Sequence, residues 1–477
     1  MSGPWETVVG LEVHCELGTA TKLFCGCRNA FGDEPNTNVC PVCLGLPGSL
    51  PVLNRQAVEL AMRIGAALHA EVRPSTFHRK NYFYPDMPKD FQVSQYDEPI
   101  DVGGWLDVPG GRVGIVRAHI EEDTGKTSHV GAGGRIQSAD YALVDYNRAG
   151  VPLVEIVSEP DIRSAAQARA YAAELRAVLV ATGASDGRME EGSMRVDANV
   201  SVRPSGTEEL GTRCEVKNLN SLRSVARAVE HEAARQVALI EAGGVVAQET
   251  RHWDEDAGRT VTMRSKEEAF DYRYFPEPDL VPLSPDAGWR ERASAAVGLL
   301  PADRRRRLAD LLGPGRTAAH DDQVQSVVDQ GLDDLVVAAA AGGAPAALAL
   351  ARAANELAAD LDAARRLDPG AFTALLAMES AAAVTATQAK AVLAELLAGG
   401  GDPAAIAAER GFEAMAEGSL AEVVGRVVEA NPEEWARYAA GEDKLAGFFT
   451  GQVMKATGGQ ADGKAVAADL RRRRDPR

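Results

Sequence analysis

The sequence changes character near residue 290, and this change restricts the chain to at least two kinds of domain. Nineteen of the 25 aromatic residues precede residue 291, whereas the remainder of the 477 residues is rich in alanine. Glycine and proline interrupt that second part at 313–315, 342–345 and 399–403, and such breaks separate short helices. We therefore expect a mixed domain followed by helical ones.

Alternating apolar and polar residues predict strands in the first part. The segment 8–17 alternates between aliphatic residues and the polar Glu12, His14 and Glu16, the pattern of a strand with one buried face. Further alternating segments are 195–204 and 214–219, and helical patterns cover 56–71, 164–182 and 222–241. Because these strands and helices do not alternate regularly, we predict an α+β domain with a largely antiparallel sheet. The expected domains are 1–292, 293–407 (all-α) and 408–477 (a small helical tail).

Charge and hydropathy exclude several classes of protein. The 69 acidic and 51 basic residues give a net charge of -18, which argues against a protein that coats nucleic acid by bulk charge. Residues 444–477 run against this trend, with eight Lys or Arg and three Asp. The run Arg471–Arg474 either contacts phosphates or is merely solvated. No segment has the roughly 20 apolar residues of a membrane span, and the N-terminus lacks a signal-peptide pattern, so we expect a cytoplasmic protein without a membrane partner.

Four cysteines have the spacing of a zinc site. Cys25 and Cys27 form one close pair, and Cys40 and Cys43 form a second after a gap of twelve residues. Two such pairs across a short loop supply the four thiolates of a closed, tetrahedral structural Zn²⁺ site. The alternative is four reduced thiols on a loop without metal.

Several acidic clusters indicate a divalent cation. Glu12 and His14 share one strand face, where their side chains can converge on one ion. The segment 117–129 contains Thr-Gly-Lys-Thr at 124–127 but has Ile120 where a phosphate-binding loop needs glycine. Its carboxylates and His119 fit Mg²⁺ instead, although a solvated charged turn has the same composition. Glu155, between apolar neighbours, needs a partner or a metal.

Basic and aromatic residues near these clusters favour a nucleotide. The segment 78–97 contains Arg79, Lys80 and Tyr82, and 271–279 has a similar composition. Such interleaving suits stacking on a base and binding of a phosphate. A packed loop with surface charges would have the same composition. The segment 189–204 supplies oxygen donors and arginine forks, namely Asp197, Asn199, Arg195 and Arg203. Together these features indicate Mg²⁺-ATP chemistry without a known nucleotide-loop motif.

These motifs together resemble one protein family, the B subunits of the tRNA-dependent amidotransferases. The matching segments are 10–17, 25–54, 79–97, 119–129, 143–164, 189–204, 215–221, 248–251 and 271–283, followed by 447–462. The resemblance implies a catalytic cradle domain with a zinc knuckle. It also implies that the enzyme uses Mg²⁺-ATP to phosphorylate the side-chain carboxylate of Glu-tRNA(Gln) or Asp-tRNA(Asn), after which ammonia displaces phosphate.

The resemblance also implies partners and site residues. Ammonia would come from a glutaminase subunit of the amidase type, and a small third subunit would bridge the two in a heterotrimer that acts on misacylated tRNA and not on DNA. Glu12, His14 and Glu122 match metal-binding positions at the mouth of an ammonia channel, and we add Glu155 as a catalytic candidate. The expected nucleotide-binding residues are Arg79, Lys80, Tyr82, Arg195, Asp197, Asn199 and Arg203, and the zinc ligands are Cys25, Cys27, Cys40 and Cys43.

Two features of the chain bear on these expectations. It lacks an amidase signature and a convincing Cys/His glutaminase pair, so a partner would have to supply the ammonia. The tail has fewer lysines near Lys455 than expected for a tRNA-binding domain, so the tRNA contact either depends on Arg471–Arg474 or is weak. The competing hypothesis is a non-catalytic tRNA-binding scaffold, but a scaffold for an anion has no reason to carry so many carboxylate clusters.

Overall fold

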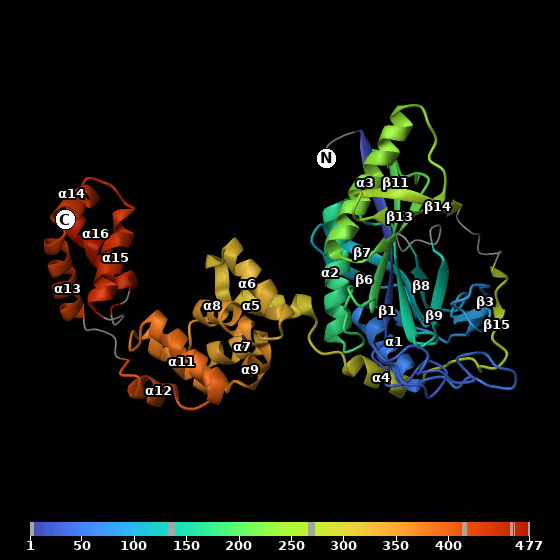
Figure 1. Ribbon diagram of the computed structural model, residues 1–477, viewed down its shortest axis with the longest axis horizontal. Coiled ribbons are helices and arrows are strands. Elements are labelled where there is room, and N and C mark those ends of the chain that lie inside the picture. Colours follow the sequence, from blue (N-terminus) through green and yellow to red (C-terminus); the bar gives the residue numbers. More distant parts are fainter. Residues whose placement is uncertain are drawn as a thin grey trace. The chain divides into compact units, whose positions relative to one another are not determined.

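The computed structural model describes residues 4–131, 139–265, 272–412, 417–457, 461 and 463–475. The chain divides into two compact units, Met1–Pro301 and Ala302–Arg477, the first built on a sheet and the second helical (Figure 1). This confirms the predicted α+β class, with its largely antiparallel sheet followed by helices. None of the described helices can cross a membrane alone; only the bent pair Ala386–Gly399 and Pro403–Glu409, at 115°, has the length and composition when taken together.

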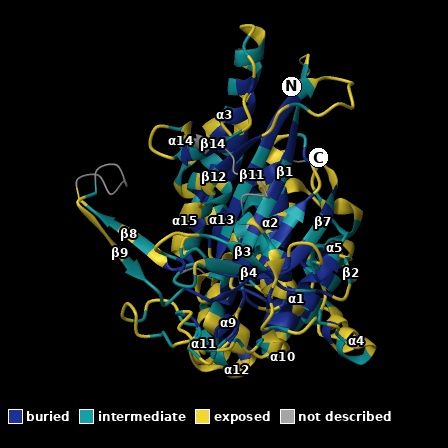
Figure 2. Cartoon of the chain, turned by 90° about the vertical axis from the view of Figure 1, so that its right-hand side faces the viewer, coloured by how far each residue is buried: buried dark blue, intermediate teal, exposed yellow. Residues whose placement is uncertain are grey.

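One large sheet organises the first unit. The strands are β1 (Trp5–Glu16), β2 (Glu71–Val72), β3 (His78–Asn81), β4 (Phe91–Ser94), β5 (Asp101–Val102), β6 (Trp105–Val108), β7 (Gly111–Glu122), β8 (Lys126–Val130), β9 (Tyr141–Asp145), β10 (Pro152–Ser158), β11 (Met194–Pro204), β12 (Cys214–Leu219), β13 (Glu249–Asp254), β14 (Arg259–Ser265) and β15 (Phe275–Pro276). In the described residues the main order is β14-β13-β12-β11-β1-β10-β7-β4-β3-β15, and β8 pairs with β9 in a separate ribbon. All pairs are antiparallel except β12 with β13. Figure 2 shows the β8–β9 ribbon projecting away from the main sheet.

Helices cover the apolar face of this sheet. They are α1 (Arg55–Ala67), α2 (Ala165–Ala181), α3 (Leu222–Glu241) and α4 (Ala287–Ala295), and the first three lie along one side of the strands (Figure 1). Leu11, Val13 and Cys15 on β1 are fully buried in the core that these helices close. The predicted alternation of this strand is therefore confirmed, and its polar residues face the opposite side.

The helix ends follow local chemistry. Ser164 and Ser221 cap α2 and α3, because each side chain accepts a hydrogen bond from a backbone N–H of the first turn. Gly243 follows α3 with φ +79, a conformation that favours glycine and ends the helix near its predicted end. The prediction of a helix to residue 71 was too long: α1 stops at Ala67, since His69 has φ 59 and Glu71 begins β2.

The second unit contains helices with two separate clusters of buried side chains. Its helices are α5 (Pro301–Leu312), α6 (Ala318–Asp329), α7 (Asp333–Ala341), α8 (Ala346–Asn355), α9 (Leu361–Arg366), α10 (Pro369–Ser380), α11 (Ala386–Gly399), α12 (Pro403–Glu409), α13 (Glu417–Ala430), α14 (Pro432–Ala439), α15 (Leu445–Ala456) and α16 (Gly463–Arg474). One cluster extends from Leu308 to Ala407, and the other from Leu420 to Leu470. The domain limits at 292 and 407 remain predictions.

Three of the four arginines at the end of α16 have partners within this unit. Arg472 and Arg473 bond Asp469 at 2.6 Å each, and Arg474 bonds Asp443 at 2.7 Å. Arg473 also donates to the backbone oxygen of Ala421 at 2.5 Å, which ties α16 to α13. Much of this charge is therefore balanced locally, and Arg471 and Arg472 are the exposed members of the run.

A buried carboxyl beneath α1 makes stability depend on pH. Asp101 is fully buried, and its two oxygens have no hydrogen-bond partner among the described residues. Burial raises its pKa well above the usual value, so the folded chain holds a proton that the unfolded chain releases above about pH 4. The carboxyl packs on Gly65, where a Cβ would collide with it.

Stability should consequently fall as pH rises from about 4 towards the raised pKa of Asp101, by up to ~1.4 kcal/mol per pH unit for this group. Asp101→Asn removes this titration. We expect the unfolding temperature of Asp101→Asn, relative to that of the wild type, to be higher at pH 8 than at pH 5. Asp107→Asn, at an exposed position paired with Arg112, is the control. A difference that is the same at both pH values would contradict a protonated Asp101.

Candidate active site and metal sites

The polar face of the sheet forms a cavity of about 580 Å³. Strand register aligns its side chains across three neighbours: His14 on β1 is opposite Glu155 on β10, and Glu155 is opposite His119 on β7. On the other side of β1, Glu12 is opposite Asp197 on β11. Because side chains two residues apart share a face, this register gathers acidic and imidazole groups contributed by segments far apart in the sequence.

The first cluster consists of His14, Glu121 and Glu155. Each can offer one ligand atom, and these atoms lie within 4.8 Å of one another. The Nε2 of His14 is 3.6 Å from Glu121 and 4.0 Å from Glu155, and the Nε2 of His119 is 3.1 Å from Glu155. Two carboxylates and one imidazole form a donor set that suits a divalent cation. His119 contacts the same oxygen of Glu155 that faces His14 and helps to fix its position, as groups around metal ligands commonly do.

The second cluster consists of Glu12, Asp197 and Glu215, also with ligand atoms within 4.8 Å of one another. Asn199 donates a hydrogen bond to Glu12 at 2.8 Å and fixes its orientation. The Nζ of Lys217 lies 2.7 Å from Asp197 and 3.0 Å from Glu215. A cation is thus already built into this cluster, and its three carboxylates fit the all-oxygen preference of Mg²⁺.

The protonation equilibria reflect this concentration of negative charge. Burial raises the pKa of Glu12, and the charges of Glu155 and Glu215 add to the effect. Burial likewise raises the pKa of Glu121. Burial also acts upward on Glu155, but the neighbouring imidazoles, chiefly His119, outweigh it and hold the pKa of Glu155 below its usual value. The raised pKa values of Glu12 and Glu121 mean that ionising these carboxyls is unfavourable, and a bound cation would offset that cost.

Cations and aromatic rings line the rest of this cavity. Arg195 donates to Asp123 at 2.8 Å, and the Nζ of Lys80 lies 4.6 Å from the ring centre of Tyr272. Two pairs of tyrosines stack, Tyr82 on Tyr84 at 4.6 Å and Tyr96 on Tyr274 at 4.0 Å. The structure therefore places the sequence candidates Lys80, Tyr82, Arg195 and Asp197 around one cavity.

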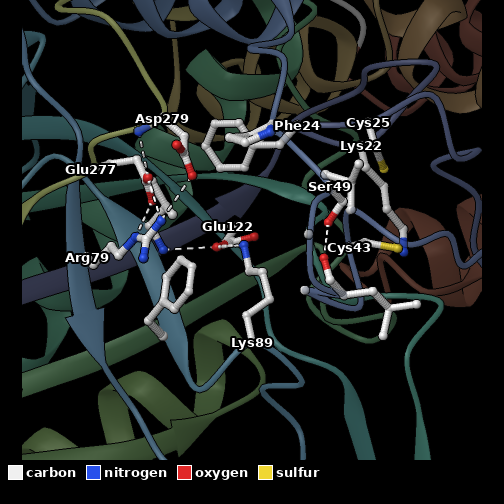
Figure 3. Close-up of a pocket in the computed structure, with 17 residues that line it drawn as sticks. Lys22, Phe24, Cys25, Cys43, Ser49, Arg79, Lys89, Glu122, Glu277 and Asp279 are labelled. Atoms are coloured by element: carbon white, nitrogen blue, oxygen red, sulfur yellow. Dashed lines mark hydrogen bonds and ion pairs between the residues drawn. The ribbon is translucent and has the colours of Figure 1, made fainter.

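Glu122 and Arg79 lie elsewhere, which corrects two expectations. Successive residues of a strand point to opposite faces, so Glu121 enters the first cluster, whereas Glu122 lines a second cavity of about 210 Å³. There Glu122 accepts a hydrogen bond from Lys89 at 2.5 Å, and Arg79 forms a two-bond pair with Glu277 at 2.6 and 2.8 Å (Figure 3). Glu122 does not join His14, and Arg79 does not line the larger cavity.

Arg203 also lies outside both cavities. It donates to Glu6 at 2.6 Å and to the backbone oxygen of Glu208, near the far end of β11. Because β11 spans 11 residues, residues at its two ends are far apart. Arg195 and Arg203 therefore cannot both contact the same small ligand. Arg203 fastens β11 to β1 through Glu6, so its part in nucleotide binding is not supported.

The four cysteines converge as their spacing predicted. Cys25, Cys27, Cys40 and Cys43 can place their sulfur atoms within 4.8 Å of one another. The Sγ atoms of Cys40 and Cys43 are 3.9 Å apart, close to the edge of a tetrahedron with Zn–S bonds of about 2.3 Å. A hydrogen bond from Cys25 is the main cause that lowers the pKa of Cys43 to about 5, and thiolates are the metal-binding form. The donor set fits a structural zinc ion.

Sequence reasoning missed three contributors to the larger cavity. Glu121 is adjacent to the sequence candidate Glu122. The alternation of side chains along a strand, which places Glu121 on the same face as His119, is the signal that distinguishes the two. Glu215 and Lys217 share a face of β12 by the same alternation, but only the pairing of β12 with β11 brings them to Asp197. A single sequence does not contain that register.

Comparison with known proteins agrees with this arrangement. Residues 7–291 match the model of the GatB/GatE catalytic domain, and residues 335–473 match that of the GatB domain. The chain is 51% identical to the B subunit of the aspartyl/glutamyl-tRNA(Asn/Gln) amidotransferase of Salinispora arenicola over 97% of this chain and 95% of the relative. The proteins of the same name from Moorella thermoacetica and Gloeobacter violaceus are 49% and 46% identical and cover 98% and 97% of this chain and 99% and 85% of their own.

The fold and the site thus define a catalytic domain of the kind shared by GatB and GatE, followed by a helical GatB domain. The chain belongs to the family of aspartyl/glutamyl-tRNA(Asn/Gln) amidotransferase B subunits.

Proposed function

We propose that this chain is the kinase and transamidase component of a tRNA-dependent amidotransferase. In the first step a side-chain carboxylate oxygen of Glu-tRNA(Gln) or Asp-tRNA(Asn) attacks the γ-phosphorus of ATP, and the bond to ADP breaks. In the second step ammonia attacks the acyl carbon of the resulting acyl phosphate, phosphate leaves, and the nitrogen loses a proton. The activation is needed because a free carboxylate is a poor electrophile.

One observation carries this proposal: two acid clusters, each suited to a divalent cation, line one cavity together with basic and aromatic side chains. Phosphoryl transfer depends mainly on positioning and on neutralising charge. His14, Glu121 and Glu155 would hold one Mg²⁺ and Glu12, Asp197 and Glu215 a second. The bound cations would supply neutralisation of the phosphate charge.

The other residues of the cavity have roles that follow from their chemistry. Lys80 and Arg195 supply positive charge for phosphate groups, and Tyr82 offers a ring for stacking on a base. Asn199 keeps Glu12 oriented through its 2.8 Å hydrogen bond. We retain these residues as nucleotide-binding candidates together with Asp197, and we no longer include Arg79 and Arg203.

Partners complete the reaction. We propose that an amidase-type glutaminase subunit supplies ammonia, that a small subunit bridges the two, and that misacylated tRNA binds with help from the C-terminal helices.

The domain limits 1–292, 293–407 and 408–477 are part of this proposal, as is a cytoplasmic location. The cavity at Lys89 and Glu122 has both polar and apolar lining residues and lies at the opposite face of β7 from His119 and Glu121, so it offers ammonia a route distinct from the nucleotide site.

The test uses the complex reconstituted with its partner subunits. We expect Mg²⁺-dependent ATP hydrolysis that rises when Glu-tRNA(Gln) or Asp-tRNA(Asn) is added, and an amide product when glutamine or ammonium is present. Correctly charged Gln-tRNA(Gln) is the control and should not stimulate hydrolysis. Tight tRNA binding without ATP hydrolysis would assign the chain to a non-catalytic scaffold and refute the proposal.

A further inference from the structure

Arg117 is a cation of the larger cavity that the mechanism above does not use. It lies on β7 on the same face as His119 and Glu121, and it lines the cavity that contains both acid clusters. Its Nε is buried and has no hydrogen-bond partner among the described residues. A buried N–H group without a partner is costly and rare in native proteins, so this position is one at which a bound ligand would restore a missing bond.

Two other cations near the acid clusters, Arg195 and Lys217, already have carboxylate partners. Arg195 is held by Asp123 at 2.8 Å, and Lys217 is held by Asp197 and Glu215 at 2.7 and 3.0 Å. In the described part of the chain, no carboxylate lies within ion-pair distance of the Arg117 guanidinium. Its charge and its planar fork therefore stay available to an anion that enters the cavity.

Register places Arg117 beside the first cluster. Glu155 is opposite His119, and Arg117 is one same-face step further along β7, about 7 Å away at the backbone. The guanidinium is close enough to Glu155 to contribute to lowering the pKa of that carboxyl. A chain of phosphate groups has the length to bridge a cation at His14, Glu121 and Glu155 and a guanidinium at this distance.

We infer that Arg117 binds a phosphate group of the nucleotide and thereby aligns the phosphate chain along β7 towards the first acid cluster. This inference rests on the proposed use of Mg²⁺-ATP in this cavity. Guanidinium is the side chain best matched to phosphate, because its parallel N–H groups bond two oxygens of one group. The adenosine part of the nucleotide makes no contact with Arg117.

The experiment measures equilibrium binding of ATP, AMP and adenosine to the reconstituted complex in the presence of Mg²⁺. Arg117→Ala should weaken ATP binding by roughly 10- to 100-fold, the range for a charge-assisted pair, and leave adenosine binding unchanged. Arg117→Lys should recover part of the loss, because it restores the charge but not the fork. Arg112→Ala, on the same strand but paired with Asp107 outside the cavity, is the matched control and should bind like the wild type.

The alternative is that Arg117 only balances the charge of Glu155. In that case Arg117→Ala would change the affinity for Mn²⁺ alone, measured without nucleotide, as much as the affinity for ATP, and this result would overturn the inference. Equal ATP binding by wild type and Arg117→Ala would overturn it as well. A wild type that binds no ATP would instead refute the proposed function.

Discussion

Replacing Glu121 by glutamine should reduce tRNA-stimulated ATP hydrolysis at least about 100-fold, because removing one preorganised charge-stabilising group at a reaction centre commonly costs that much or more. Glu121 faces His14 and Glu155, and its carboxylate belongs to the cluster whose ligand atoms lie within 4.8 Å of one another. Glutamine keeps the size of the side chain but removes the negative charge that a divalent cation needs. The measurement is the rate of phosphate release by the reconstituted complex with Glu-tRNA(Gln).

The neighbouring Glu122→Gln is the matched control. Glu122 points into the other cavity and accepts hydrogen bonds from Lys89 and from the backbone of Val93, so ATP hydrolysis should stay near that of the wild type. Thermal unfolding of both variants separates loss of the site from loss of the fold. If Glu121→Gln were active and Glu122→Gln were folded but inactive, the metal ligand would be Glu122, as the sequence motif indicated.

Replacing Cys40 by serine should abolish stoichiometric zinc binding. The four sulfur atoms converge, and structural zinc contributes free energy on the order of 10 kcal/mol to the small elements it closes. Most of the segment 25–53 is irregular backbone, and its other anchors include hydrogen bonds from the backbone N–H groups of Asn36 and Asn38 to Asp145 and Asn147. We therefore expect faster proteolysis within this segment and a lower unfolding temperature for the variant.

The control for this prediction is Cys214→Ser. Cys214 is buried on β12 beside Arg235 and the backbone oxygen of Ala247, away from the cysteine cluster. The zinc content of Cys214→Ser, measured by metal analysis of the purified variant, should equal that of the wild type. Unchanged zinc stoichiometry in Cys40→Ser would rule out a four-cysteine site.

The fold could be predicted from local patterns, whereas the membership of each site could not. Alternation in 8–17 correctly assigned Glu12 and His14 to the polar face of a strand, and the four cysteines met as their spacing predicted. Glu12 and His14, however, belong to different acid clusters, because their cross-strand neighbours on β11 and β10 differ. Such neighbours are set by strand pairing between segments more than 100 residues apart, and local periodicity does not encode that pairing.

Glu122 and Arg79, two of the residues that the structure places outside the larger cavity, show the same limit of sequence reasoning for different reasons. Glu121 and Glu122 are chemically identical, and only the parity of β7 decides which one meets His14. Arg79 had the right charge for a phosphate, but Glu277, brought beside it by the pairing of β15 with β3, neutralises it. Composition indicates which groups are present, and tertiary pairing decides which of them remain available to a ligand.

The central claim is that this chain phosphorylates the side-chain carboxylate of an aminoacyl-tRNA in the cavity formed by β1, β7, β10 and β11. The most direct measurement incubates the reconstituted complex with Mg²⁺, γ-labelled ATP and Glu-tRNA(Gln) or Asp-tRNA(Asn), without any ammonia source. We expect label on the aminoacyl-tRNA as an acyl phosphate. Hydroxylamine should attack its acyl carbon, form a hydroxamate and release the labelled phosphate, and Glu121→Gln should give no label. Absence of labelled aminoacyl-tRNA from a wild-type complex that still forms the amide would contradict the account.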